Sequence, residues 1–314
     1  MKETPIIPIF FATDDAYAPP LGVALESLLS NVREGYELRI HILSTSLSAK
    51  NKLLLRRIVG GRATLTFVDM KRRIAAIAAQ LVLRGYYSVA TYLRLFISEM
   101  FPEYDKVLYL DCDIAVNGDV SRLYELPLGK ALVAAIPEDV MARIDTFGRY
   151  VEVCLDIPRA EYFNAGILVM NLKRFRSERI LERFVDLLGR RRFPVTQDQD
   201  YLNVLCRGKV RYAPYTFNTS PLATEISEPP AIVHYKLDRK PWHYEGIHFD
   251  ECFWAYAART PYHKILLDMR AAHGEEAQRR DREGYLSLVR LAEDEILSEP
   301  ARRADLGRRV GYTG

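Results

Sequence analysis

The chain has 314 residues, of which 49% are hydrophobic and 27% are charged, and its 44 basic and 41 acidic residues leave a formal net charge of +3. This length fits one large α/β domain with an appendage, or two modest domains. The balanced charge gives no support for nucleic-acid binding as the main activity. The sequence contains no run of about 18 apolar residues, which a membrane span would need. Its four cysteines form no CxxC pair and fit a reducing compartment.

The N-terminal third alternates segments with strand-like and helix-like patterns. Its first apolar run is too short, and too interrupted by Pro8, for a signal sequence. Ser48 is a suitable N-cap for a helix, and an amphipathic helix ends before Pro102. This β-α-β-α order predicts a mainly parallel sheet covered by helices on both faces, with ligands at the carboxyl ends of the strands. The predicted strands are 6–12, 38–43, 64–68 and 107–110, and the predicted helices are 21–29, 48–59 and 89–101.

The second half continues with shorter elements and then changes character. We predict strands at 132–136, 162–170 and 231–235 and helices at 178–190 and 198–206. From about residue 257 the composition shifts, and 275–314 is rich in Arg, Glu and Asp. We expect a helical appendage or a partly disordered tail over 257–314, following a main domain over 1–256. The mixed charges of the tail support peripheral membrane association only weakly.

Two carboxylates, Asp111 and Asp113, follow the apolar strand over 107–110. Residues i and i+2 of a strand point to the same face, so we expect both carboxylates to project together from the end of the strand. Hard oxygen ligands in this arrangement suit a divalent cation, which in turn can hold phosphate oxygens. The spacing alone is equally compatible with a pair of solvated carboxylates.

Polar residues in three other segments could extend a site at Asp111 and Asp113. Asp14 follows the first strand, where a nucleotide base could lie, although an ordinary turn is the simpler reading. Arg94 stands in an apolar helix, so it either has a carboxylate or phosphate partner or extends its head to solvent. Asn164 can bond to sugar hydroxyls through a donor and an acceptor, and Gly166 either lets a ligand approach the backbone or marks a β-bulge.

Two later segments add charged and amide groups. Asp198 and Gln199 open a helix and could face the reacting carbon of a sugar, although N-capping explains part of this cluster. His234 could be a third metal ligand, and its nitrogen favours Mn²⁺ over Mg²⁺, whereas a lone histidine is more often a packed residue. Lys240 could neutralise a diphosphate. Neither GxGxxG nor GxxxxGK[ST] occurs, and a metal-held diphosphate removes the need for such a loop. Together these groups predict transfer of a sugar from a nucleotide diphosphate.

The order and spacing of these segments resemble glycosyltransferase family 8, a family of retaining enzymes with the GT-A fold, and bacterial lipopolysaccharide galactosyl- and glucosyltransferases in particular. The resemblance covers about residues 6–242 and implies a GT-A catalytic domain over 1–256 with a Rossmann-like, mainly parallel sheet. It also implies that a hexose moves from a UDP-sugar to a saccharide or glycolipid acceptor in surface polysaccharide synthesis. The expected location is the cytoplasm, with weak peripheral association with the inner membrane as an option. The segments that carry the resemblance are 11–17, 91–95, 106–113, 162–172, 197–203 and 234–242.

The resemblance also implies a role for each candidate residue. Front-face attack is the usual explanation of retention in this family, and we favour it here because the neutral amide of Gln199 would be a poor nucleophile. The implied ligands of Mn²⁺, or of Mg²⁺ in its place, are Asp111, Asp113 and His234. The implied catalytic residues beside the anomeric carbon are Asp198 and Gln199. The implied donor contacts are Ala12, Asp14 and Cys112 to uridine and ribose, Arg94 and Asn164 to phosphate or sugar, and Lys240 to the diphosphate.

Three positions depart from the pattern of the family. Related galactosyltransferases have Asn in place of Ala16, so one nucleotide contact is lost. Their acidic residue after the strand over 132–136 aligns with Pro137, although Glu138 and Asp139 are adjacent, so the donor sugar need not be galactose. Leu237 replaces a glycine whose backbone normally approaches the diphosphate, and we expect its side chain to crowd the donor unless the loop shifts.

Two other functions share some of these features. Haloacid dehalogenase-like phosphatases also have Asp-x-Asp after an apolar strand. In those enzymes a Thr follows shortly after the second Asp, whereas residues 114–116 of this chain are Ile-Ala-Val. Their mechanism would also leave His234 and Lys240 without a role. A degenerate sugar-nucleotide-binding protein would explain Leu237 and Pro137. The acceptor cannot be named from the sequence, and the segments expected to contact it are 137–160 and 214–230.

Overall fold

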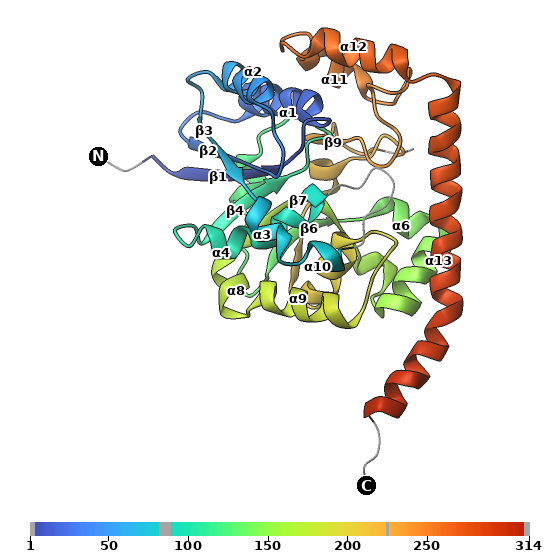
Figure 1. Ribbon diagram of the computed structural model, residues 1–314. Helices are drawn as coiled ribbons and strands as arrows, with labels where there is room; N and C mark the ends of the chain where they lie inside the picture. Colours follow the sequence, from blue (N-terminus) through green and yellow to red (C-terminus); the bar gives the residue numbers. More distant parts are fainter. Residues whose placement is uncertain (1–3, 82–88, 224–225, 311–314) are drawn as a thin grey trace.

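A seven-stranded sheet forms the centre of the computed structural model, which describes residues 4–81, 89–223 and 226–310 (Figure 1). The strand order is β3-β2-β1-β4-β7-β6-β8, and only β7 runs antiparallel to its neighbours, so the prediction of a mainly parallel α/β sheet is confirmed. The strands are β1 Ile6–Ala12, β2 Glu37–Ser44, β3 Thr64–Asp69, β4 Lys106–Leu110, β6 Val133–Pro137, β7 Phe163–Asn171 and β8 Val210–Tyr212.

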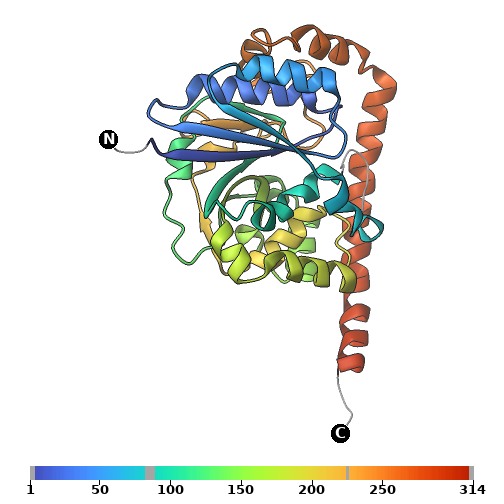
Figure 2. The same ribbon diagram turned by 60° about the vertical axis from the view of Figure 1, so that its left-hand side comes forward.

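Helices cover both faces of the sheet (Figure 2). Side chains alternate along β1, so Ile9 packs in one hydrophobic cluster with α1 and α2 while Phe10 packs in a second cluster with α9. Because both faces are buried, β1 and β4 consist of nearly continuous apolar residues. The helices of the main body are α1 Ala18–Asn31, α2 Ala49–Val59, α3 Lys71–Ala75, α4 Ile97–Met100, α5 Ser121–Tyr124, α6 Asp139–Arg143, α7 Asp145–Tyr150, α8 Leu172–Ser177, α9 Ile180–Arg190 and α10 Asp198–Cys206.

Most predicted helices are confirmed, but two differ in form. The Ser48 hydroxyl accepts a hydrogen bond from the Asn51 backbone N–H, as expected of an N-cap. The predicted helix over 89–101 is instead a 3₁₀ segment, Val89–Phe96, followed by the short α4. The predicted helix over 178–190 begins at Ile180, because Arg179 adopts a left-handed φ of 55° that separates α8 from α9.

A small second sheet joins two distant parts of the chain. Its strands are β5, Ile114–Val116, and β9, Ile232–His234, and they pair antiparallel with Ile114 opposite His234. Since β4 belongs to the central sheet and β5 to the small one, residues 111–113 form the connection between the sheets. This connection brings His234 beside the two carboxylates.

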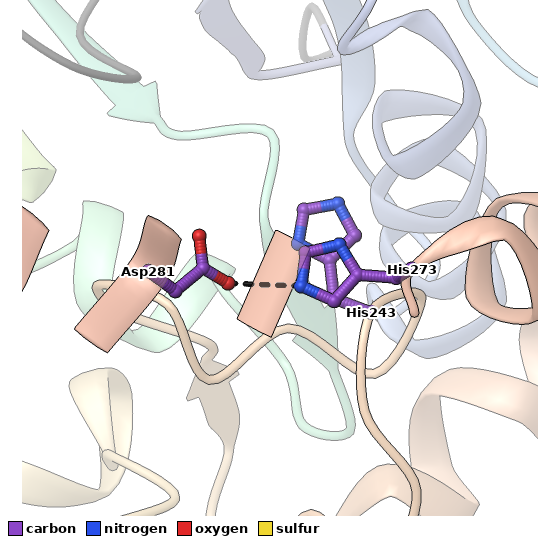
Figure 3. Close-up of side chains that lie close together, drawn as sticks. All are labelled: His243, His273 and Asp281. Atoms are coloured by element: carbon purple, nitrogen blue, oxygen red, sulfur yellow. Dashed lines mark hydrogen bonds and ion pairs between the residues drawn. The ribbon is translucent and has the colours of Figure 1, made fainter. Parts of the chain in front are cut away.

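Three helices complete the described part of the chain, and none of its helices is long and apolar enough to span a membrane. The last helix runs along one side of the molecule (Figure 1) and contacts α7. At its first turns Asp281 pairs with His273, beside His243 (Figure 3). These helices are α11 Asp250–Ala257, α12 His263–Ala272 and α13 Glu275–Val310.

Candidate functional site

One pocket collects every site residue that the sequence predicted. It opens at the carboxyl ends of β1 and β4, where ligands of such sheets bind. Its lining also includes residues that sequence analysis did not assign to the site, namely Tyr17, Thr91, Tyr109, Lys236 and Thr196. The predicted residues in the lining are Ala12, Asp14, Arg94, Asp111, Cys112, Asp113, Asn164, Asp198, Gln199, His234 and Lys240.

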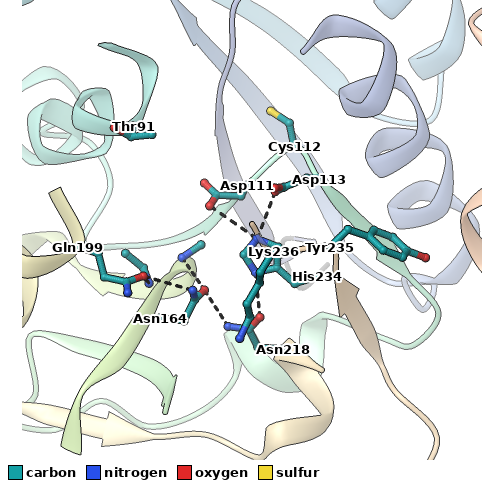
Figure 4. Close-up of polar contacts among 12 residues, drawn as sticks. Thr91, Asp111, Cys112, Asp113, Asn164, Gln199, Asn218, His234, Tyr235 and Lys236 are labelled. Atoms are coloured by element: carbon teal, nitrogen blue, oxygen red, sulfur yellow. Dashed lines mark hydrogen bonds and ion pairs between the residues drawn. The ribbon is translucent and has the colours of Figure 1, made fainter. Parts of the chain in front are cut away.

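Asp111, Asp113 and His234 present three candidate metal ligands to one point (Figure 4). Their ligand atoms all lie within 4.8 Å of one another. The Nε2 atom of His234 lies 3.2 Å from Asp113 Oδ1 and 3.9 Å from Asp111 Oδ2. Since Asp111 and Asp113 connect two sheets and are not part of a strand, their convergence comes from the β5–β9 pairing and not from strand alternation.

Gly166 makes room for this group of ligands. A Cβ atom at this position would contact His234 Cε1 and would lie 2.6 Å from Asp111 Oδ2. The register of β6 and β7 also shifts just before Ile136, so the predicted bulge is present as well. The two oxygen donors and one imidazole, with space kept free beside them, fit a divalent cation such as Mn²⁺.

Asn218 orients the imidazole of His234. Its side-chain nitrogen donates to Asn164 Oδ1 over 2.9 Å, so its oxygen faces His234 Nδ1, also at 2.9 Å. This assignment places the proton of His234 on Nδ1 and leaves the lone pair of Nε2 directed at the carboxylates. Asn218 lies on no recognisable motif of the site, so its contact with His234 cannot be predicted from the sequence. Only the pairing of distant segments brings Asn218 there.

Lys240 pairs with Asp113 and also donates to the backbone oxygen of Tyr235. Burial alone would raise the pKa of the Asp113 carboxyl, but Lys240 and His234 hold that pKa well below its usual range. Asp113 is therefore ionised, as a metal ligand must be. A buried ammonium group beside the cation ligands is also suited to an anionic group such as a diphosphate.

Arg94 is buried and paired, so the alternative of an arginine that reaches solvent is excluded. Its Nη2 donates to Asp111 Oδ1 over 3.1 Å, and its guanidinium lies over the Tyr109 ring, 4.3 Å from the centroid. Its Nε–H is directed at the backbone oxygen of Thr91, 2.8 Å away. Asp198 Oδ2 lies 3.1 Å from the same Nε, yet receives no hydrogen bond from the described residues.

Asp198 and Gln199 lie in the first turn of α10 and line the pocket. Gln199 lies on the opposite side of the pocket from Cys112 (Figure 4). Burial raises the pKa of Asp198 to about 6, although Arg94 opposes this shift. The amide oxygen of Gln199 accepts hydrogen bonds from the Ala165 N–H, at 2.9 Å, and from the Asn164 amide, at 3.2 Å. Gln197 enters this turn with a φ of 55°, an uncommon angle for a residue other than glycine.

Glu138 and Lys236 bring a second ion pair into the wall of the pocket. The ammonium group of Lys236 lies 3.0 Å from Glu138 and 2.9 Å from Asp139. Glu138 also accepts a hydrogen bond from the Asn164 amide. An acidic group thus lies in the pocket next to Pro137, the position at which this chain departs from the sequence pattern of the family.

Leu237 lines the pocket and adopts a φ of 54°. Glycine adopts this left-handed angle more easily than a residue with a side chain, so Leu237 holds a backbone conformation that suits glycine. The expected crowding of the donor by the Leu237 side chain stays a prediction.

The uridine side of the predicted site is formed by the turn after β1. The Sγ atom of Cys112 lies 3.2 Å from the backbone oxygen of Ala12, and burial raises the pKa of its thiol well above the usual value. Asp14 accepts a hydrogen bond from the Tyr17 N–H, 3.1 Å away. Asp14 therefore also stabilises the turn into α1, in agreement with the alternative of an ordinary turn in this segment.

The family model named Glycosyl transferase family 8 matches residues 8–246. The chain belongs to this family. The resemblance found in its motifs is thus confirmed, and the α/β architecture with a mainly parallel sheet agrees with the fold of solved GT-A relatives.

Individual relatives are similar over much of the chain. A putative glycosyltransferase from Haemophilus influenzae is 26% identical over 77% of this chain and 74% of its own length. The lipopolysaccharide 1,2-glucosyltransferase of Escherichia coli is 28% identical over 58% of this chain, which spans only 55% of that enzyme. The crystal structure of the galactosyltransferase LgtC, in complex with donor and acceptor sugar analogues, superposes with a TM-score of 0.69 and 29% identity over 81% of this chain and 96% of LgtC.

Proposed function

We propose that this protein is a retaining hexosyltransferase that moves galactose or glucose from a UDP-sugar to a saccharide or glycolipid acceptor in the synthesis of lipopolysaccharide or another surface polysaccharide. The observation that carries the proposal is the convergence of Asp111, Asp113 and His234 beside Lys240 in one pocket. The family relationship supports glycosyl transfer, and the E. coli relative acts on lipopolysaccharide.

In this proposal Asp111, Asp113 and His234 hold Mn²⁺. A bound Mn²⁺ supplies positive charge against the oxygens of a diphosphate leaving group. Lys240 adds a second positive charge, which must turn from Asp113 towards the diphosphate when the donor binds. Ala12, Asp14 and Cys112 line the part of the pocket proposed for uridine and ribose.

Asn164, Arg94 and Glu138 are proposed to position the sugar. The Asn164 amide donates to Glu138 and to Gln199, so the groups that would bond to sugar hydroxyls are already oriented by one another. Glu138 follows Pro137, which stands where related galactosyltransferases have an acidic residue. We propose that Glu138 takes over the part of that residue in recognising the donor sugar. Comparing UDP-galactose with UDP-glucose for wild type and Glu138→Gln tests this role, since only a residue in contact with the sugar changes the ratio of the two rates.

For the chemical step we propose front-face attack with Asp198 and Gln199 beside the anomeric carbon. The Gln199 oxygen is directed by two N–H donors and belongs to a neutral amide, so it suits charge stabilisation better than nucleophilic attack. A covalent glycosyl-enzyme adduct on any residue, Asp198 and Gln199 included, found by mass spectrometry after incubation with the donor, would overturn this proposal. Retention of the donor's anomeric configuration without an adduct supports it.

The decisive experiment measures UDP release from a panel of UDP-sugars with and without Mn²⁺. We expect metal-dependent release that falls by at least about 100-fold in Asp113→Asn, the size of effect seen when one preorganised electrostatic group is removed. Asp268→Asn, at an exposed carboxylate on α12, is the matched control and should keep full activity. Unchanged activity of Asp113→Asn would rule out the metal assignment.

A protein that binds sugar nucleotides without turnover is the second candidate, favoured by Leu237 in the pocket wall. It predicts that UDP-sugars bind in the presence of Mn²⁺ with no release of UDP under any tested acceptor. Release of phosphate from simple monoesters would instead support the phosphatase alternative.

A further inference from the structure

A second cluster of potential metal ligands lies outside the pocket, where three segments meet. His243 follows the Lys240 loop, His273 comes directly after α12, and Asp281 lies in the first turns of α13 (Figure 3). Their ligand atoms all lie within 4.8 Å of one another. None of the three lines the donor pocket, so the proposed transfer reaction gives this cluster no role.

The two imidazoles are stacked face to face next to the carboxylate. Their ring centroids are 4.2 Å apart with an interplanar angle of 1°, and His273 Nε2 lies 2.9 Å from Asp281 Oδ2. Neither ring nitrogen of His243 has a hydrogen-bond partner among the residues that the structure describes. Two adjacent imidazoles, one of them without a hydrogen bond to any described residue, leave nitrogen lone pairs that the described part of the chain does not use.

The surroundings of Asp281 are typical of a ligand whose orientation is fixed. The Tyr244 hydroxyl donates to Asp281 Oδ2 over 2.7 Å, as an outer partner of a metal-binding carboxylate would. The side chains of His273 and Asp281 are only 11% and 21% exposed, so the cluster is shielded but can be reached from solvent. Two imidazoles and one carboxylate match the donor set of zinc sites that keep a fourth position for water.

We propose that His243, His273 and Asp281 form a second metal site, which takes a divalent transition metal of the zinc class with water as the fourth ligand. Zinc bonds of about 2.0–2.1 Å require ligand atoms closer together than the 4.8 Å limit of the metal-free arrangement. The stacked rings must therefore rotate out of their parallel arrangement so that both nitrogens face one ion. This site differs from the donor site, whose two carboxylates and single imidazole favour a harder cation.

The position of the second site links the C-terminal helices to the donor pocket. The backbone N–H groups of His243 and Tyr244 both donate to the Lys240 oxygen, at 2.9 and 3.0 Å, and Lys240 pairs with Asp113. An ion held by His243, by His273 after α12 and by Asp281 of α13 would fix the end of the loop that carries Lys240. The proposed ion therefore has a structural role, because it holds the loop in the conformation that places Lys240 for binding the diphosphate.

The test uses the full chain with both donor-site carboxylates changed, Asp111→Asn and Asp113→Asn, so that only the second site can bind zinc tightly. Equilibrium dialysis with Zn²⁺ should then retain one equivalent of metal, and saturating Zn²⁺ should raise the Tm. Adding His273→Gln should abolish both effects, whereas His248→Gln, at an exposed histidine, should leave them unchanged. Absence of stoichiometric zinc in the double variant, or undiminished binding with His273→Gln, would overturn the site.

A second variant covers the case in which His273→Gln does not fold. His243→Cys keeps a ligand for zinc-class metals, and Co²⁺ bound there should show a thiolate charge-transfer band in the near ultraviolet that the parent chain lacks. A folded His243→Cys protein that binds Co²⁺ without this band would exclude His243 as a ligand. Both experiments read metal binding alone, so their outcome is independent of whether the chain transfers a sugar.

Discussion

Gly166 lacks a side chain at the point where two of the candidate cation ligands approach the backbone of β7. We predict that Gly166→Ala displaces the Asp111 carboxylate, which would lie 2.6 Å from the new Cβ, and weakens both Mn²⁺ affinity and UDP release. The matched control is Gly61→Ala, where a Cβ meets nothing within 4 Å. Calorimetric titration with Mn²⁺ measures the affinity, and wild-type affinity in Gly166→Ala would contradict the assigned geometry.

His41 provides a pH-dependent contribution to stability that is separate from the site. Its ring stacks on Phe10, its Nδ1 has no hydrogen-bond partner among the described residues, and burial lowers its pKa to about 4. The unfolded chain binds this proton near pH 6.5 and the folded chain only near pH 4, so the stability present above pH 6.5 is lost as the pH falls through this interval.

We therefore predict that His41→Phe removes part of the acid sensitivity of the fold. The expected gain at pH 4 relative to pH 7 is on the order of 2 kcal/mol in the free energy of unfolding, measured by urea denaturation at both pH values. If wild type and variant lose stability equally between pH 7 and pH 4, the histidine is not the cause.

At the level of single residues, motif spacing predicted which side chains line one pocket, because carboxylates after an apolar strand and a distant His and Lys have few other uses in combination. Asn218 and Lys236 could not be predicted in this way. Asn218 gains its role only through the pairing of β5 with β9. Lys236 gains its role from Glu138 and Asp139, about 100 residues away in the chain, and its type alone predicts a solvent-exposed residue.

At the level of elements, the strands were predicted most accurately, because buried parallel strands are continuous apolar runs. The segment over 89–101 was predicted as one α-helix, since its apolar residues have a helical period, yet its first part is 3₁₀. In this segment tertiary contacts outweigh the local pattern. Arg94 lies there, paired with Asp111, and such a contact between distant segments leaves no mark in local periodicity.

In the loop from His234 to Lys240, the left-handed backbone angle of Leu237 can be tested separately from the size of its side chain. Leu237→Gly removes both the side chain and the left-handed strain, whereas Leu237→Ala removes most of the side chain and keeps a residue with a Cβ at φ 54°. If the side chain crowds the donor, both variants should lower the KM for the UDP-sugar. Steady-state kinetics that show an unchanged KM in both variants would exclude crowding by Leu237.

For the whole molecule, the expected division is a catalytic domain over 1–256 and a C-terminal segment over 257–314, and we propose that the segment braces the domain. Tyr262 and Leu266 are buried in the cluster that contains β1, and Leu288 and Ala292 in the cluster on the other face of the sheet. A chain that ends at residue 256 exposes both clusters. We predict that it unfolds at a lower urea concentration than the full chain, and equal midpoints would show that the segment is energetically independent.

A contact between α1 and Tyr262 tests the same coupling without truncation. A Cβ at Gly22 would lie 2.5 Å from Tyr262 Cδ2 and 3.0 Å from Ile58 Cδ1. Gly22→Ala should therefore lower the free energy of unfolding by about 1–3 kcal/mol through overpacking. In a Tyr262→Ala background the same change should be neutral or stabilising, because alanine is the better helix former inside α1. A loss that persists without the Tyr262 ring would place its cause within the main body. A loss that disappears would show that the C-terminal segment and α1 are packed as one structure.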